Sequence, residues 1–537
     1  MPLTMIVRGG IVHDGTGSDA VLADVGIEGD RVVQVARPGD LPDASAARIV
    51  EADGLAVVPG FVNVLSHAWG SLQADGSGAS DLLQGVTTEV FGEVLSLGPS
   101  TEDLATLAES MGLGTEARVV FDHLRDGLDH LVGLGVAPNV ASFIGGHNLR
   151  LLGAGFEDRP LTAGELRRLL GIVREEMQDG ALGIATALIY PPGSYADTDE
   201  LSAVCGPVGE YGGTYISHLR SEGDQFLECL DELLEIGRRA ECRTEVYHLK
   251  AAGRPNWPKM QHAIDRIQLA RDGGQEVGAN MYPYRAGGTS LSASIPPAFH
   301  DGGPSALVAR LADRATRARM AAAMRERSGE FENLFLAAGG GEGILFLSDL
   351  ADGTPARGKR LSEVAVSIGI DDEAEALLEV VARAPATDAA YFIIDEANIE
   401  LGLSQPWVSL GSDAAAHRAV PPFTDEETHP RTYGTFARFL GHYVRDRGVT
   451  TFPEAIRRMT SMPADALGLE GRGRLVPSSF ADVVVLDPAL VADRSDFMDS
   501  HQYAVGVKHV LVNGTPVVAD GTIGDARPGR RLARGRT

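Results

Sequence analysis

Several features typical of secreted, membrane and nucleic-acid-binding proteins are missing from this sequence of 537 residues. It has only three cysteines, without CxxC spacing, which argues against a disulfide framework and against a zinc knuckle. No apolar run approaches the roughly 18 residues of a transmembrane helix, and the first residues lack the apolar core of a signal peptide. Positive charge is also scarce, since the formal net charge is −27. These absences predict a cytoplasmic protein without a nucleic-acid or membrane partner, and they leave homo-oligomerisation open.

What the sequence does contain is enough apolar material, 44% of its residues, to bury a large core in more than one structural unit. Both ends show Val/Ile alternation broken by tight-turn pairs such as Asn513-Gly514, which is typical of short β-strands. Between the ends, apolar segments of four to six residues alternate with amphipathic stretches. This pattern predicts a buried parallel sheet with helices, an α/β fold. An Ala- and Arg-rich stretch at about 301–345 predicts a helical insertion.

Polar residues follow several of the predicted strands directly: His147, His218, His248 and Asp413. In parallel α/β barrels the active-site residues project from the carboxyl ends of the strands. A single histidine in such a place is more often a hydrogen-bonded core or loop residue than a ligand. Their repetition at successive strand ends favours a common site.

Ordered segments along the chain resemble the N-acyl-D-amino-acid deacylase (D-aminoacylase) branch of the amidohydrolase superfamily. They include PGFVNVLSH (59–67), QGVTTEVFGE (84–93), ISHLRSEGD (216–224), VYHLKAAG (246–253), SLGSD (409–413) and HPRTYGTFARFLG (429–441). The resemblance implies a distorted TIM (β/α)8 barrel plus a small β-sandwich formed from the two terminal segments. The expected boundaries are 1–58 and 471–537 for the sandwich and 59–470 for the barrel.

The resemblance also implies a metal site, but two positions depart from the family pattern. His218 and His248 match two of the ligand histidines. Where relatives have His-x-His, this chain has Leu65-Ser66-His67, so only His67 remains and a second ion is not expected. The family cysteine is absent, and its position falls on Glu93 or, with another gap placement, on Val94. A carboxylate is the chemically sensible third ligand of a mononuclear site, so we expect His218, His248 and Glu93, with His67 beside them, to hold one divalent ion, Zn2+.

The remaining matches assign the chemistry and the substrate contacts. Asp413 matches the aspartate that acts as general base toward a metal-activated water and then as general acid toward the leaving amine. Lys250, Tyr282 and Arg431 match substrate-binding positions, and the guanidinium of Arg431 suits a carboxylate. The resemblance therefore implies metal-dependent hydrolysis of the amide bond of a small N-acyl amino acid, with N-acyl-D-amino acids as the expected class.

Two other functions are compatible with the sequence. A cyclic amide or imide hydrolase usually needs a bridging carboxylated lysine between two metals, and Lys250 is the only lysine beside these histidines. A non-catalytic protein on the same scaffold would explain the lost ligands, but it would not explain the intact His218, His248 and Asp413.

Overall fold

The two ends of the chain share one sheet. The computed structural model describes residues 3–42, 46–110 and 120–535, and within them β5 pairs antiparallel with β18. The strand path is β21-β20-β19-β18-β5-β1-β2-β3, with β4 paired to β1. Its members are β1 (Met5–Val12), β2 (Val21–Glu28), β3 (Arg31–Ala36), β4 (Ile49–Glu51), β5 (Ala56–Pro59), β18 (Val483–Leu486), β19 (Val507–Val512), β20 (Thr515–Ala519) and β21 (Thr522–Ile523).

Parallel strands form the middle of the molecule, as the apolar segments predicted. They lie in two hydrogen-bonded sheets, β6-β7-β8 and β17-β13-β12-β11-β10-β9, and every neighbouring pair is parallel. These strands are buried on both faces, which explains their continuous rather than alternating apolar pattern. Their bounds are β6 (Phe61–Asn63), β7 (Val86–Phe91), β8 (Asn139–Ser142), β9 (Ile144–Gly145), β10 (Gly183–Ala187), β11 (Thr214–His218), β12 (Arg243–Val246), β13 (Val277–Met281) and β17 (Val408–Leu410).

Amphipathic helices connect successive parallel strands. The sequence sets their limits, as in α6, where Thr162 and Glu165 form a capping box at the first turn. The apolar residues of α8, such as Leu230, Leu233 and Ile236, are buried against the strands, and its arginines lie in the last turn. These connecting helices are α6 (Ala163–Gln178), α7 (Thr198–Glu210), α8 (Phe226–Ala240) and α9 (Lys259–Asp272).

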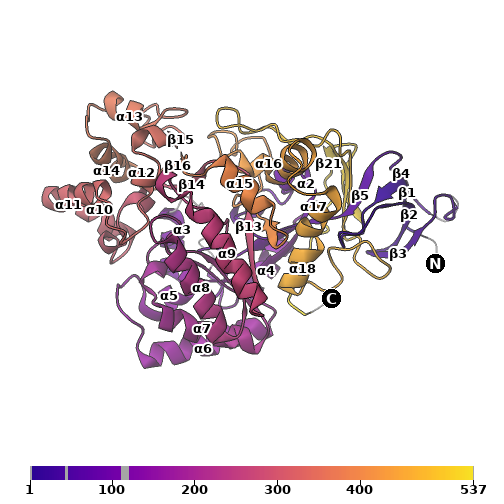
Figure 1. Ribbon diagram of the computed structural model, residues 1–537, viewed down its shortest axis with the longest axis horizontal. Coiled ribbons are helices and arrows are strands. Elements are labelled where there is room, and N and C mark those ends of the chain that lie inside the picture. The colour runs from indigo at the N-terminus through magenta and orange to yellow at the C-terminus, as the bar shows by residue number, and fades with distance from the viewer. Residues whose placement is uncertain (1–2, 43–45, 111–119, 536–537) are drawn as a thin grey trace.

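The segment between β13 and β17 is larger than the helical insertion expected at about 301–345. Besides helices it contains a three-stranded antiparallel sheet in the order β14-β16-β15. In Figure 1 it lies at the opposite end of the molecule from the terminal strands. Its elements are β14 (Gly287–Ser290), α10 (Pro304–Ala312), α11 (Arg314–Arg325), α12 (Leu334–Ala337), β15 (Ile344–Phe346), α13 (Leu361–Ser367), α14 (Glu373–Arg383) and β16 (Asp388–Tyr391).

The structure also bears on the predictions about disulfides and about membrane spans. Cys205, Cys229 and Cys242 are all buried and form no disulfide. Across the described residues, no helix has both the length and the apolar character that crossing a membrane requires.

Candidate metal and catalytic site

The carboxyl ends of the parallel strands bring five of the expected site residues to one cavity. His67, Glu93, His248 and Asp413 each follow a strand within a few residues, and His218 is the last residue of β11. The cavity has a volume of about 500 Å³ and is lined by all five. The carboxyl ends of strands from both parallel sheets thus bring chain segments that are far apart in the sequence to one cavity.

The backbone turns sharply at two of these positions. His248 has a φ of 32° and Asp413 a φ of 52°, a region that non-glycine residues rarely adopt. Hydrogen bonds hold both turns, because the His248 amide donates to Asn280 Oδ1 at 2.9 Å and the Asp413 amide donates to the Leu65 carbonyl at 2.9 Å. Such conformations cost about 1–3 kcal/mol each and concentrate at functional sites. Here they turn the two side chains into the cavity.

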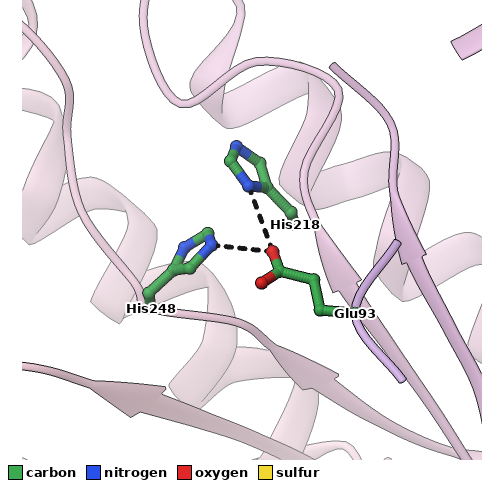
Figure 2. A group of neighbouring side chains, drawn as sticks. All are labelled: Glu93, His218 and His248. Carbon is green, nitrogen blue, oxygen red and sulfur yellow. Dashed lines mark hydrogen bonds and ion pairs between the residues drawn. The ribbon is translucent and has the colours of Figure 1, made fainter. Parts of the chain in front are cut away.

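Glu93, His218 and His248 converge on a common point, as Figure 2 shows. Glu93 Oε1 lies 3.3 Å from His218 Nδ1 and 3.1 Å from His248 Nε2. Ligand atoms bound to a tetrahedral zinc ion lie roughly 3.3 Å from one another, given bond lengths of about 2.0–2.2 Å. One carboxylate oxygen and two imidazole nitrogens at this spacing therefore fit a single divalent ion.

A second group of possible ligands lies beside the first. His67 Nε2 is 3.1 Å from Glu93 Oε2 and 3.1 Å from Asp413 Oδ1. The neighbouring Leu65, which stands where relatives have a histidine, is 1% exposed and packs in an apolar cluster with Val62 and Phe143. A leucine turned into that cluster offers no ligand, so this second group has one imidazole and two carboxylates, of which Glu93 is shared with the first group.

The electrostatics of the site favour positive charge between the carboxylates. Burial opposes ionisation of Glu93, but the field of His248 and hydrogen bonds from the three histidines lower the pKa of this carboxyl well below its usual range. Burial also disfavours the charged form of His218 and so lowers its pKa. The carboxylates of Glu222 and Glu93 outweigh this effect and raise the pKa of His218 to about 10. Hydrogen bonds to Asp413 and Glu93 overcome burial and raise the pKa of His67 to about 9. With these raised pKa values, His67 and His218 carry an additional proton when no cation is bound. A cation bound between the carboxylates would displace these protons.

Glu222 contacts the far side of both ligand histidines, a role that the sequence did not reveal. Its Oε1 lies 3.0 Å from His248 Nδ1, and its Oε2 lies 3.3 Å from His218 Nε2. If each of these nitrogens, the one facing Glu222, carries the ring proton, the opposite nitrogen, the one facing Glu93, has a free lone pair. Glu222 thus selects the tautomers that a metal requires. The nearby Arg220 does not pair with Glu222 but with Glu232, at 3.0 Å.

Lys250 lies at the cavity wall but is engaged within the protein. Its ammonium group is 2.7 Å from Glu222 Oε1, 2.7 Å from His248 Nδ1 and 3.2 Å from the His248 carbonyl. The two oxygens accept hydrogen bonds from the ammonium group, whereas His248 Nδ1 is only a close neighbour of it in the tautomer that a metal requires. In this arrangement Lys250 balances the Glu222 charge rather than presenting free donors to the cavity.

Arg431 and Tyr282 form the wall next to Asp413. The Nη1 atom of Arg431 lies 2.5 Å from Asp413 Oδ2, Nη2 donates to the Gly288 carbonyl at 3.3 Å, and the guanidinium lies 4.7 Å from the centre of the Tyr282 ring. Burial would raise the pKa of the Asp413 carboxyl, but the Arg431 charge outweighs it and the pKa is lowered. Asp413 is therefore ionised and able to accept a proton, and the charge of Arg431 lowers its basicity.

His147 lies outside this group of side chains. Its Nε2 hydrogen-bonds the Tyr190 carbonyl at 3.0 Å, and its ring packs so tightly against Gly193 that a β-carbon there would lie 2.5 Å from it. Burial lowers the pKa of His147 to about 4, so the ring is neutral at pH 7. His147 holds the segment that carries Tyr190, which lines the cavity.

Sequence comparison decides the family. A model of the amidohydrolase family matches residues 48–518. The chain belongs to the amidohydrolase family. A D-aminoacylase of Alcaligenes xylosoxydans xylosoxydans is 32% identical over 99% of this chain and 98% of its own length. An N-acyl-D-aspartate deacylase of the same organism is 32% identical over 99% of this chain and 95% of its own.

A solved structure agrees with this assignment. The N-acyl-D-glutamate deacylase of Bordetella bronchiseptica, complexed with zinc and a phosphonate mimic of the tetrahedral intermediate, matches with a TM-score of 0.82 and 29% identity. The match covers 99% of this chain and 100% of that chain. The predicted resemblance to the D-aminoacylase branch of the amidohydrolases is therefore confirmed, and so is the α/β fold.

Proposed function

We propose that this amidohydrolase deacylates N-acyl-D-amino acids with one divalent ion, Zn2+, held by Glu93, His218 and His248. The observation that supports this most directly is the convergence of these three side chains, 3.1–3.3 Å apart, in the cavity that also contains Asp413. The curated relatives act on N-acylated D-amino acids by name, and the structure of one such relative contains zinc.

The protein's own residues divide the work of amide hydrolysis among them. An ion bound at this site would supply Lewis-acid polarisation of the scissile carbonyl and would lower the pKa of water. Asp413 accepts the proton of the nucleophilic water at its carboxylate and later donates it to the departing amine. His67, between Glu93 and Asp413, fixes the orientation of both carboxylates. Glu222 keeps the two ligand imidazoles in the required tautomer.

For the substrate carboxylate we propose Arg431, supported by Tyr282 and Lys250. Arg431 lines the cavity, and its buried Nε has no partner among the described residues. Tyr282 lies beneath it and lines the same cavity. Lys250 adds positive potential from behind Glu222. A bidentate or forked contact is the geometry in which arginine binds carboxylates best.

We also propose that the parallel strands close into a distorted barrel, flanked by a β-sandwich built from residues 1–58 and 471–537. The two parallel sheets are linked at one side by the Phe143 amide, which donates to the Phe91 carbonyl at 2.9 Å. At the other side the segments after β6 and β17 meet, with a parallel bridge between Ser66 and Ala414. These links support a ring of strands with the site at one mouth.

The metal content tests the proposal and separates it from a non-catalytic protein. After dialysis against metal-free buffer, we expect elemental analysis to find about one zinc ion per chain, because the second group of ligands has lost an imidazole at Leu65. The zinc-loaded protein should hydrolyse N-acetyl-D-amino acids, with ninhydrin detecting the released amine. Two tightly bound ions per chain would contradict the single-ion site. No retained metal together with no turnover would favour the non-catalytic alternative.

Replacing Arg431 tests the substrate-carboxylate assignment. We expect Arg431→Met to raise KM for an N-acetyl-D-amino acid by about 10- to 100-fold, the range for loss of a hydrogen bond to a charged group. Because Arg431 also sets the basicity of Asp413, kcat should fall too, but by less. The matched control is the same amino acid as its carboxamide, for which the variant and the wild type should have similar KM values. An equal KM change for acid and amide would show that Arg431 does not bind the carboxylate.

A further inference from the structure

One charged residue of the cavity is not engaged in the proposed chemistry. Asp388, the first residue of β16, lines the same cavity as the proposed metal ligands, and its side chain is exposed there. Among the described residues its carboxylate has no hydrogen-bond or ion-pair partner. The other carboxylates that line the cavity each contact at least one cationic or imidazole group; they are Glu93, Glu222 and Asp413.

The position of Asp388 relative to Arg431 follows from the register of β14 and β16. Ser290 pairs with Asp388 and Gly288 pairs with Ala390, so these four residues lie on one face of the sheet. The Gly288 carbonyl accepts the hydrogen bond from Arg431, and a β-carbon at Gly288 would point to that guanidinium at 3.5 Å. Asp388 is one cross-strand pair further along this face, a step of about 7 Å. Asp388 therefore lies within the length of a long side chain from an amino acid whose carboxylate binds Arg431.

The surroundings of Asp388 favour a cation at this point. Although the side chain is exposed to the cavity, desolvation by the surrounding walls raises the pKa of the Asp388 carboxyl to about 7, Glu426 adds to the rise, and Arg431 opposes it. A positively charged ligand would stabilise the ionised form, whereas an acidic side chain would be repelled by the Asp388 carboxylate. The cavity also has apolar lining residues that can pack against an aliphatic stem, among them Trp69, Tyr391 and Phe423.

We propose that Asp388 binds an ammonium or guanidinium group of the substrate, so that the preferred substrates are cationic N-acyl-D-amino acids such as N-acyl-D-lysine. This inference rests on the proposed deacylase function and specifies its substrate class. It differs from the acidic side chains that the names of two curated relatives indicate. Asp388 acts here as a specificity-determining residue and takes no part in proton transfer.

The test compares substrates that differ only in the charge of one group. With the zinc-loaded full-length protein, kcat/KM is measured for N-acetyl-D-lysine, for its Nε-acetylated form, for N-acetyl-D-norleucine and for N-acetyl-D-glutamate. We expect the lysine substrate to exceed the neutral and acidic ones by at least about 10-fold. Asp388→Asn should lower kcat/KM for the lysine substrate by roughly 10- to 100-fold, the range for a charge-assisted hydrogen bond. The same variant should change the norleucine value by less than about 3-fold.

A matched control and a second pair of substrates sharpen the result. Glu426→Gln removes the neighbouring carboxylate, which is exposed and does not line the cavity, and should leave the lysine preference intact. N-(4-aminobutanoyl)-D-leucine and N-pentanoyl-D-leucine place the charge on the acyl chain instead. If Asp388→Asn changes the kcat/KM ratio of this pair but not the ratio of the lysine and norleucine substrates, the cationic group that Asp388 binds lies on the acyl chain.

Two outcomes would overturn different claims. If norleucine and glutamate substrates react as well as the lysine substrate, and Asp388→Asn affects all equally, the cation-binding role of Asp388 is wrong while the deacylase function stands. If the zinc-loaded wild type hydrolyses none of the N-acyl-D-amino acids, the proposed function itself is wrong. Circular dichroism of each variant checks that the fold is retained.

Discussion

Asp413→Asn should lower kcat by about 10²- to 10⁴-fold, the usual contribution of a general acid–base group, with the bound zinc retained. Asparagine keeps the shape of the side chain and can still contact His67 and Arg431, but its amide oxygen is a very weak base. Asp413 also lies outside the three-ligand group of Glu93, His218 and His248, so the ion has no reason to leave. Steady-state kinetics combined with elemental analysis of the same sample measures both quantities.

Arg431→Met serves as the control for this substitution. Asp413 and Arg431 form a buried ion pair at 2.5 Å, and breaking such a pair can disturb the site through the charge left behind. If the broken pair caused the loss in Asp413→Asn, then Arg431→Met, which keeps the carboxylate, would show a similar fall in kcat. A residual kcat above about a tenth of the wild-type value in Asp413→Asn would show that Asp413 is not the general base.

The placement of the main site residues was predictable from the sequence because strand ends converge in a parallel sheet. His218, His248 and Asp413 each follow an apolar segment, and the structure gathers them at one edge. The choice between Glu93 and Val94 was not settled by sequence, since it depended on the placement of a gap. In the structure the Glu93 carboxylate faces the imidazoles, 3.1–3.3 Å from His218 and His248.

The contacts that the sequence could not predict depend on long-range geometry. Glu222 reaches both histidines because the loop after β11 turns back, and no spacing rule distinguishes it from a residue that pairs with Arg220. Lys250 matched a substrate position, yet its ammonium group contacts Glu222 and His248. Asp388 enters the cavity through the pairing of β14 with β16, elements separated by about a hundred residues of insertion. Register between such distant antiparallel strands is not encoded in a local pattern.

Glu93→Ala should abolish both zinc binding and turnover. This substitution removes the carboxylate oxygen that lies between His218 Nδ1 and His248 Nε2 and leaves two imidazoles, which are too few for a stable structural or catalytic zinc site. Loss of outer-shell partners alone costs about 10- to 100-fold in metal affinity or activity, so loss of a direct ligand should exceed about 100-fold in kcat/KM. Dialysis followed by elemental analysis, and activity with and without added zinc, give the two readouts.

Two further variants distinguish a ligand from a carboxylate that merely shapes the site. Glu93→Cys places a thiolate, itself a good zinc ligand, at the same backbone position and should restore most of the metal content. Asp388→Asn removes a different carboxylate from the same cavity and should retain the full ion. Full zinc retention in Glu93→Ala would transfer the third-ligand role to His67, which lies 3.1 Å from Glu93 and from Asp413. In that event His67→Ala should lose the metal instead, because His67 is the one imidazole besides His218 and His248 in the two ligand groups of the described residues.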